Sequence, residues 1–228
     1  MHAKASMGTL QPEVAAARAT QTTRTLLWSC GRSIGCIGVD CAVALDAGRP
    51  LTASPAVGAA WHCAVMTTST ELTLFADYFQ IHVADADSDG DLSDAWTDQA
   101  VADHLAVAPD ALGIGTSVNV DVSVTVDVLA QEPSDDSAEF DHVVEAGLIV
   151  SAGRLRILGC TDYGPEAATF EVPPGGNRVR VSRRNLARAT QADVDSHKTP
   201  ETTEKVRIQV WSNPELTARI IKRWSRSL

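Results

Sequence analysis

The chain has 228 residues, 44% of them hydrophobic, which is enough apolar material for the packed core of one good-sized domain or two small ones. Its formal net charge of −10 argues against nucleic acid or an anionic membrane surface as a direct partner. The five cysteines are odd in number and include no CxxC pair, so their spacing excludes a zinc knuckle and favours a reducing compartment. We therefore expect a cytoplasmic protein without a membrane-spanning segment.

The acidic residues are concentrated in the middle of the chain. Residues 66–212 contain 25 aspartates and glutamates against ten lysines and arginines, whereas the two flanking segments each carry a small positive excess. Between Glu71 and Gly153 there are 18 acids and no lysine or arginine, and every base of the middle block lies at Arg154 or beyond it. The sequence thus joins an acidic half to a mixed half.

Residues 1–65 show neither a sustained helical period nor a strand period, and the composition changes abruptly at Met66. We predict that this segment is disordered or a non-native N-terminal extension, with Met66 as the natural initiator. The alternative is a flexible tail that is really translated. The intact mass of the protein from its own host would distinguish the two.

The first strand signal is ELTLFADYFQIHV, residues 71–83, in which apolar residues alternate loosely. Five of its side chains are available for a core, namely Leu72, Leu74, Tyr78, Phe79 and Ile81. A short helix is predicted next, over WTDQAVADHLA, residues 96–106.

Several features favour this helix. Thr97 is a suitable N-cap, and Asp98 is favourable in the first turn because it faces the positive end of the helix dipole. Val101 and Leu105 have the i, i+4 spacing of an apolar face. Trp96 is expected to pack in the core and to anchor the start of the helix.

Strand signals dominate the second half of the chain. VSVTVDVLA, residues 122–130, alternates strictly and places Val122, Val124, Val126 and Val128 on one face. Residues 140–160 indicate a hairpin with Gly153 in its turn, and residues 168–184 indicate a second hairpin around PPGGN. KVRIQVW, residues 205–211, closes the set with Val206, Ile208 and Val210 on one face.

These elements predict a mainly β fold, an antiparallel β-sandwich with one short helix. We assign the sandwich domain to residues 66–212 and a basic C-terminal tail to residues 213–228.

The acidic run DADSDGDLSDAW, residues 85–96, begins like a calcium-binding loop, with aspartates at alternate positions and Gly90 at the turn. Its twelfth position is Trp96, which cannot supply the bidentate carboxylate, and a strand rather than a helix precedes it. We favour a solvated acidic loop in front of a helix. Calcium binding stays the alternative, with Asp85, Asp87, Asp89 and Asp91 as ligands and no other cofactor expected.

Cys160, His142 and Asp162 are the one set of residues that could form a thiol-based catalytic triad. The register of the predicted hairpin does not determine whether the thiol and the imidazole meet. A lone cysteine on a strand is usually a small buried hydrophobe, so we predict that the protein is not an enzyme.

Arg178, Arg180, Arg183 and Arg184 form a basic strip, with Arg178 and Arg180 on one face of a strand. Two interpretations are open. The strip could pair with the acidic half of the same molecule, or it could bind an anion. We favour pairing within the molecule, because it requires no partner.

From Tyr78 through Arg180 the sequence resembles the competence protein J family of small bacterial nuclease inhibitors. The likeness is carried by DYFQIHV, by AWTDQAV at the predicted helix start, by LAVAPDALGIGTSVN, and by a Pro-Gly turn before a strand in FEVPPGGNRVRV. The acidic loop at 85–91 is longer than in the family, and residues 1–65 have no counterpart. The resemblance implies a compact β-sandwich that binds and blocks a nuclease, on a fold that can change its target.

Electrostatics favour the same function. A nuclease that grips DNA carries a cationic cleft, and clustered carboxylates can imitate a phosphate array and steer association. We therefore predict an acidic protein-binding module that acts as an inhibitor or immunity protein on a basic partner such as a nuclease. The candidate contact residues are Asp85, Asp87, Asp89, Asp91, Asp94, Asp135, Asp136 and Glu139.

Overall fold

The structure is a computed structural model, and it describes residues 22–24, 68–162 and 164–225. The predicted N-terminal extension and Met66 therefore lie outside the described residues, except for β1 (Thr22–Arg24). This strand pairs antiparallel with β2 (Thr68–Phe75) and forms one edge of a sheet.

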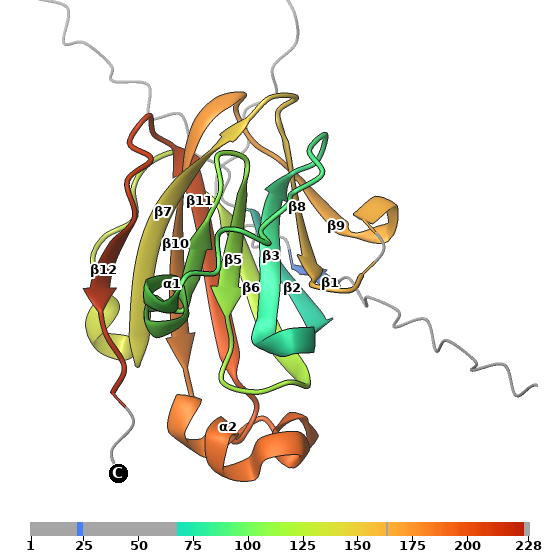
Figure 1. Cartoon of the computed structure of the whole chain (residues 1–228), viewed down its shortest axis with the longest axis vertical. Helices are drawn as coiled ribbons and strands as arrows, with labels where there is room; N and C mark the ends of the chain where they lie inside the picture. Colours follow the sequence, from blue (N-terminus) through green and yellow to red (C-terminus); the bar gives the residue numbers. More distant parts are fainter. Residues whose placement is uncertain (1–21, 25–67, 163, 226–228) are drawn as a thin grey trace, which may run out of the picture.

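The described strands form two sheets that face each other, so the predicted mainly β sandwich is confirmed (Figure 1). The seven-stranded sheet has the order β1, β2, β6 (Asp121–Val128), β11 (Lys205–Ser212), β10 (Gly175–Arg184), β7 (His142–Val150) and β12 (Arg219–Lys222). The five-stranded sheet has the order β4 (Leu105–Val107), β5 (Ala111–Gly115), β3 (Gln80–Asp85), β8 (Arg154–Gly159) and β9 (Ala168–Glu171). Within the described residues, β6 and β11 pair in parallel, and the other strand pairs are antiparallel.

As the strictly alternating pattern predicts, the side chains on one face of β6 and on one face of β11 lie in the core between the two sheets. Val122, Val124 and Val126 are fully buried, as are Val206, Ile208 and Val210 to within 1%. Burying each such side chain stabilises the fold by about 1.5–3 kcal/mol. Val128, at the end of the predicted face, is only partly buried.

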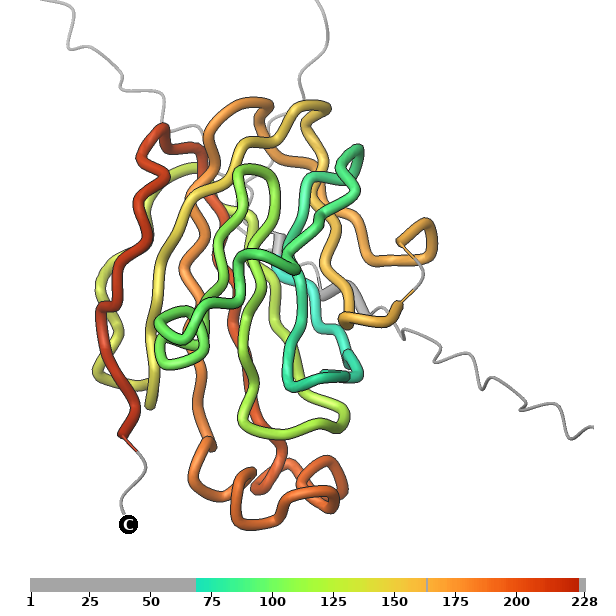
Figure 2. Tube along the Cα trace, in the orientation of Figure 1, coloured from blue at the N-terminus to red at the C-terminus, as the bar shows by residue number. Residues whose placement is uncertain are grey.

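The two predicted hairpins are wrong, because the chain changes sheet at both turns (Figure 2). β7 pairs with β10 and β12, whereas β8 pairs with β3 and β9. A contact distant in sequence holds the first crossing: Asp85, at the end of β3, accepts hydrogen bonds from Ser151 N at 2.9 Å and from its hydroxyl. Gly153 does turn the chain, with φ of +74°. Its carbonyl accepts from Val172 N at 2.9 Å, which joins the two crossings to each other.

The predicted short helix is confirmed as α1 (Asp98–Asp103), and the Thr97 hydroxyl caps it by accepting from Ala100 N at 3.2 Å. It is shorter than predicted, because His104 takes a left-handed conformation with φ of +52° and ends it. Val101 is consequently exposed, while Leu105 is buried in β4.

Other helical segments join the strands. α2 (Leu186–Ala192) follows β10 and was not predicted. The short 3-10 helices are η1 (Asp77–Phe79), η2 (Ser137–Glu139), η3 (Gly164–Glu166) and η4 (Asp193–Lys198). Among the described residues, no helix combines the length and the apolar character that crossing a bilayer would require.

The basic C-terminal segment contributes the edge strand β12, which lies beside β7 (Figure 1). On the adjacent β7, the fully buried Glu145 lies opposite Arg219 and contacts three arginines: Arg178 at 3.0 Å, Arg180 at 2.6 Å and Arg219 at 2.6 Å. Burial opposes ionisation of Glu145, but the hydrogen bonds from these arginines outweigh it and hold its pKa below the usual value.

The favoured interpretation of the basic strip, pairing with the acidic half of the molecule, is confirmed for Arg178 and Arg180, which both pair with Glu145. Arg183 also pairs inside the molecule, at 2.8 Å, but its partner Glu204 lies in the mixed half. Arg184 differs, because its side chain is exposed at the end of β10.

Candidate functional site

Three aromatic side chains are exposed where β2 turns into β3, and we call them the aromatic turn. Tyr78 is 72% exposed, Phe79 52% and Phe75 39%. The prediction that Tyr78 and Phe79 belong to the core is wrong. The inward-facing positions change at this point from Leu72 and Leu74 to Ile81 and Val83, because η1 interrupts the strand.

The backbone of this turn is strained. Tyr78 and Phe79 have φ of +53° and +58°, values that bulky side chains rarely adopt. Each such residue costs on the order of 1–3 kcal/mol and persists only where the surroundings hold it.

Several hydrogen bonds hold the strained turn in place. Tyr78 N donates to Asp77 Oδ1 at 3.0 Å, and Phe79 N donates to Asn119 Oδ1 at 3.1 Å. Thr116 N donates to the Phe79 carbonyl at 2.8 Å. These bonds fix the backbone from which the two exposed rings project.

Carboxylates flank the aromatic turn. Asp77 belongs to it, and Asp121 lies opposite Phe75 in the β2–β6 register. Asp162 Oδ2 accepts a hydrogen bond from Gly159 N at 2.7 Å. Gly159 is itself close to the turn, since a side chain there would place its Cβ 2.4 Å from the Phe75 carbonyl oxygen. This end of the molecule therefore combines exposed aromatic rings with acidic neighbours.

The predicted acidic loop follows β3 at the other end of that strand, and its aspartates have different environments. Asp85 is buried, and burial would raise its pKa, but hydrogen bonds from Ser151 and from Asp87 N outweigh that and lower it. The Asp87 carboxylate pairs with Arg154 at 3.0 Å. The remaining three, Asp89, Asp91 and Asp94, are exposed. Hydrogen bonds from Ser93 lower the pKa of Asp91.

The other predicted acids lie in the connection from β6 to β7. Asp136 forms a bidentate ion pair with Arg207, at 2.7 and 2.8 Å, whereas Asp135 and Glu139 are exposed. This connection is attached to β12, since Lys222 donates to the Phe140 carbonyl. The acidic loop after β3 lies beside β8, and the connection from β6 to β7 lies beside β12, on opposite sides of the view in Figure 1. The structure therefore does not bring the eight acids together.

The residues of the calcium alternative are partly engaged by other groups. Asp85 accepts from Ser151, and Asp87 is paired with Arg154. In the part of the chain that the structure describes, no three His, Cys, Asp or Glu side chains are grouped as metal ligands would be.

The residues of the hypothetical thiol triad are not brought together. Cys160 follows β8 in the five-stranded sheet, whereas His142 begins β7 in the other sheet. Asp162 bonds the backbone of Gly159. Burial raises the pKa of the Cys160 thiol, and the carboxylate of Asp77 raises it further, which is the opposite of what a thiolate nucleophile needs.

His142 is instead fully buried and packs edge-on against the half-buried His104, with ring centroids 5.4 Å apart. Its Nε2 donates to the Asp103 carbonyl at 3.1 Å, and its Nδ1 accepts from Trp224 N at 3.2 Å. Burial lowers the pKa of both imidazoles to about 4, and the charge of Arg183 adds to this effect. Both rings are neutral near pH 7, and they tie α1 to the C-terminal segment.

Sequence reasoning missed the aromatic turn, although a signal was present. The buried positions shift from even to odd numbers across ADYFQ, residues 76–80, which marks a break within the predicted strand. Because Tyr78 and Phe79 are largely apolar, their residue types favour a place in the core, although they lie at this break and are exposed.

No family model matches the chain, and no curated protein matches it. Two solved structures resemble it. One is ComJ of Bacillus subtilis, described as the inhibitor of the DNA-degrading activity of NucA, with a TM-score of 0.48 and 17% identity over 65% of this chain and 98% of that chain. The other is crocagin biosynthetic gene J, with a TM-score of 0.43 and 16% identity over 66% of this chain and 99% of that chain. The resemblance to competence protein J that the sequence indicated is confirmed.

Proposed function

We propose that this chain is a protein-binding module that docks on a basic protein and blocks it, as an inhibitor or immunity protein blocks a nuclease. The observation that carries the proposal is the pair of exposed aromatic residues, Tyr78 and Phe79, held at positive φ by hydrogen bonds. Strain of this kind gathers at binding sites, because a fold without such a use would relax it.

The aromatic turn has the properties of an interface anchor. Tyrosine and other aromatic side chains supply a large share of binding energy at protein interfaces, where they fill pockets of the partner. A turn that is already ordered loses little conformational entropy on docking. Tyr78 and Phe79 would therefore contribute mainly to the lifetime of the complex.

The exposed acids act through charge rather than through contact at the turn. Asp89, Asp91 and Asp94, together with Asp135 and Glu139, are exposed and have no ion pair within the described residues. Their field attracts a cationic cleft, such as that of a nuclease, and raises the association rate. Asp87 and Asp136 contribute less, since each is paired with an arginine of the chain, and Asp85 contributes less because it is buried and bonded by Ser151.

Three variants separate these two contributions. The first replaces both rings (Tyr78→Ser with Phe79→Ser), and the second neutralises the loop (Asp89→Asn, Asp91→Asn and Asp94→Asn). The control, Val194→Ser, removes an exposed apolar side chain from η4, far along the chain. Each is used to capture partners from a lysate of the native host at low and at moderate salt. The captured protein is then purified and assayed for DNA degradation with and without the chain.

We expect a basic protein that the wild-type chain captures and inhibits. The ring variant should dissociate at least about 100-fold faster, as the loss of a central anchor does. The loop variant should associate about tenfold more slowly at low salt and like the wild type at high salt. Equal capture by the ring variant, or capture of no basic protein at low salt, would contradict the proposal.

A further inference from the structure

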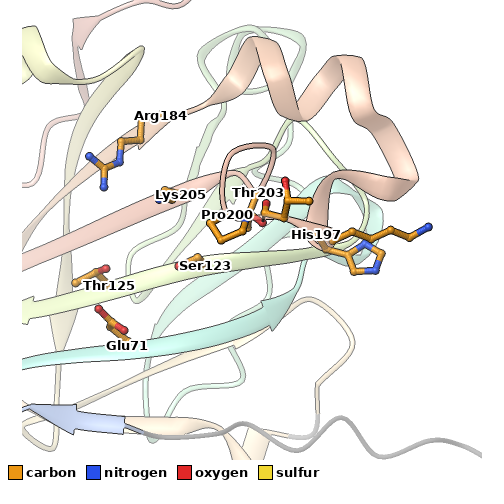
Figure 3. A pocket seen from close by; sticks show the side chains of 10 residues that line it. Glu71, Ser123, Thr125, Arg184, His197, Pro200, Thr203 and Lys205 are labelled. Atoms are coloured by element: carbon orange, nitrogen blue, oxygen red, sulfur yellow. Dashed lines mark hydrogen bonds between the residues drawn. The ribbon is translucent and has the colours of Figure 1, made fainter.

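A pocket of about 400 Å³ lies on the outer face of the seven-stranded sheet (Figure 3). Its floor consists of side chains from β2, β6, β10 and β11, namely Glu71, Ser123, Thr125, Arg184 and Lys205. The wall is formed by the end of η4 and the loop that leads to β11. Figure 3 shows Arg184, Thr125 and Glu71 on one side, Thr203, Pro200 and His197 on the other, and Lys205 and Ser123 between them.

The strand register lines up the two cations of the floor. Lys205 lies opposite Ser123 in the parallel pair of β11 and β6, and opposite Arg184 in the antiparallel pair of β11 and β10. Neighbouring strands are about 4.8 Å apart, so these three side chains span about 10 Å across the sheet. A single oxyanion can contact members of this row at the same time.

These two cations differ from the other arginines of β10. Arg178, Arg180 and Arg183 each bond a buried glutamate. Within the described residues, neither Arg184 nor Lys205 has an ion pair. The floor therefore holds two cations that are in no ion pair, beside one carboxylate, that of Glu71, in a chain whose net charge is −10.

Hydroxyl groups complete the floor. Ser123 and Thr125 are half-buried, and among the described residues their hydroxyls have no hydrogen-bond partner in the protein. In the wall, Lys198 is occupied by Asp195 at 2.7 Å, while Thr199 and Thr203 contribute further polar groups. Guanidinium, ammonium and hydroxyl donors on one floor are the set that recognises a phosphate group.

We infer that this pocket binds a small phosphate monoester, with the phosphate between Arg184 and Lys205. Its volume lies within the range of small-molecule sites, so it also accommodates the organic part of the ligand. The wall is polar, which suits a hydroxylated group such as a sugar. Glu71 opposes the charge of the phosphate and can accept a hydrogen bond from such a hydroxyl.

Calorimetric titration with glucose 6-phosphate, adenosine monophosphate and inorganic phosphate tests this inference. The combined variant Arg184→Gln with Lys205→Gln should bind the two monoesters at least about tenfold more weakly, because two charge-assisted contacts are lost. Glu71→Gln should bind them more tightly, because it removes a repelling charge. Arg188→Gln, an exposed arginine of α2 outside the pocket, is the matched control and should bind as the wild type does.

Thermal unfolding of each variant verifies that it folds, and glucose without phosphate serves as a negative ligand. Several results would overturn the inference. They are the absence of saturable binding at millimolar monoester, equal binding by the combined variant, or equal binding of glucose. Tighter binding of a single-stranded oligonucleotide than of adenosine monophosphate, dependent on Arg184 and Lys205, would assign the pocket to nucleic acid instead.

Discussion

The outer face of the seven-stranded sheet has two halves that treat their cations in opposite ways. On the half formed by β7, β10 and β12, Arg178 and Arg180 are buried, and they converge on the fully buried Glu145. On the half formed by β2, β6 and β11, Lys205 and the exposed Arg184 line an open pocket. The same strand, β10, supplies arginines to both halves.

The two halves differ because other segments of the chain cover one of them and leave the other open to solvent. Where residues 213–217 and the connection from β6 to β7 lie over the sheet, their carbonyl groups accept hydrogen bonds from Arg178 and Arg180. These arginines are removed from water, and each needs a carboxylate. Arg219 of β12 donates to the same Glu145, so the network also holds the edge strand. Where nothing among the described residues covers the sheet, a cation stays hydrated and needs no partner. Ligand binding is therefore expected at the charged groups that have no ion pair within the described residues.

The largest effect is expected from Glu145→Ala on the covered half. The change leaves three arginines without their common carboxylate, which should lower the free energy of unfolding by about 3–5 kcal/mol. Denaturant unfolding measures it, and Glu145→Gln should lose less because it keeps an acceptor. Glu171→Ala, at an exposed position of β9, is the control. A loss below about 1 kcal/mol for Glu145→Ala would mean that the covered network does not stabilise the sheet.

The next largest effect is expected from acid, which should lower the free energy of unfolding through the packed imidazoles of His104 and His142. Their pKa is about 4 in the folded chain and about 6.5 when unfolded, so between these values the unfolded chain binds protons that the folded chain does not. The free energy of unfolding should fall as the pH decreases from about 6.5 to about 4. Replacing both histidines by glutamine should remove most of the slope above about pH 5, where His82, whose pKa burial also lowers, gives the remainder. Below about pH 5, carboxylates whose pKa the fold lowers, such as Glu145 and Asp85, add to the slope. An unchanged slope would contradict this assignment.

A surface ion pair should matter much less than the covered network. Asp87 and Arg154 are each almost half exposed, at 48% and 46% of the side chain. Asp87→Asn should therefore cost only about 0.2–1 kcal/mol in denaturant unfolding, and less in high salt. A loss as large as that of Glu145→Ala would remove the distinction between covered and open charges.

On the open half, Arg184→Ala should leave the free energy of unfolding within about 0.5 kcal/mol of the wild type. Arg180→Ala, four residues earlier on the same strand, should cost several times more, because it leaves part of Glu145 without a donor. The ratio of the two losses is the most direct measure of how covering changes the role of a β10 arginine.

Calcium should produce the smallest effect. Because Ser151 and Arg154 already engage Asp85 and Asp87, we expect no change in melting temperature on addition of about 1 mM calcium. A rise of several degrees, absent with magnesium, would favour the alternative in which loop 85–94 is a calcium site.

The alternating strands could be predicted from sequence, because one face of each is buried. Val122, Val124 and Val126, like the apolar face of β11, follow directly from that rule. The crossings at residues 151–153 and 172–174 could not be predicted. Two alternating runs around a short turn have the same local pattern in a hairpin and in a crossing, and the contacts that hold the crossing, such as that between Asp85 and Ser151, join residues far apart in the sequence.

The candidate sites were predicted only in part. Glu145 stands as a single acid in the apolar run DHVVEAGLIV, and nothing near it in the sequence shows that three arginines surround it. The paired state of Asp87 and Asp136 depends on Arg154 and Arg207, which are 67 and 71 residues away. The pocket is formed by four strands, the end of η4 and a loop, so no single segment indicates it.

The parallel pairing of β6 with β11 also has a consequence for how the chain is made. β6 leaves the ribosome long before β11. Until β11 has been synthesised, β2 is the one strand among those described that can pair with β6. A nascent chain in this state exposes an unpaired strand edge, which promotes aggregation. Completion of the sheet therefore waits for synthesis of residues 205–212, and folding should be slow because it depends on contacts between distant segments.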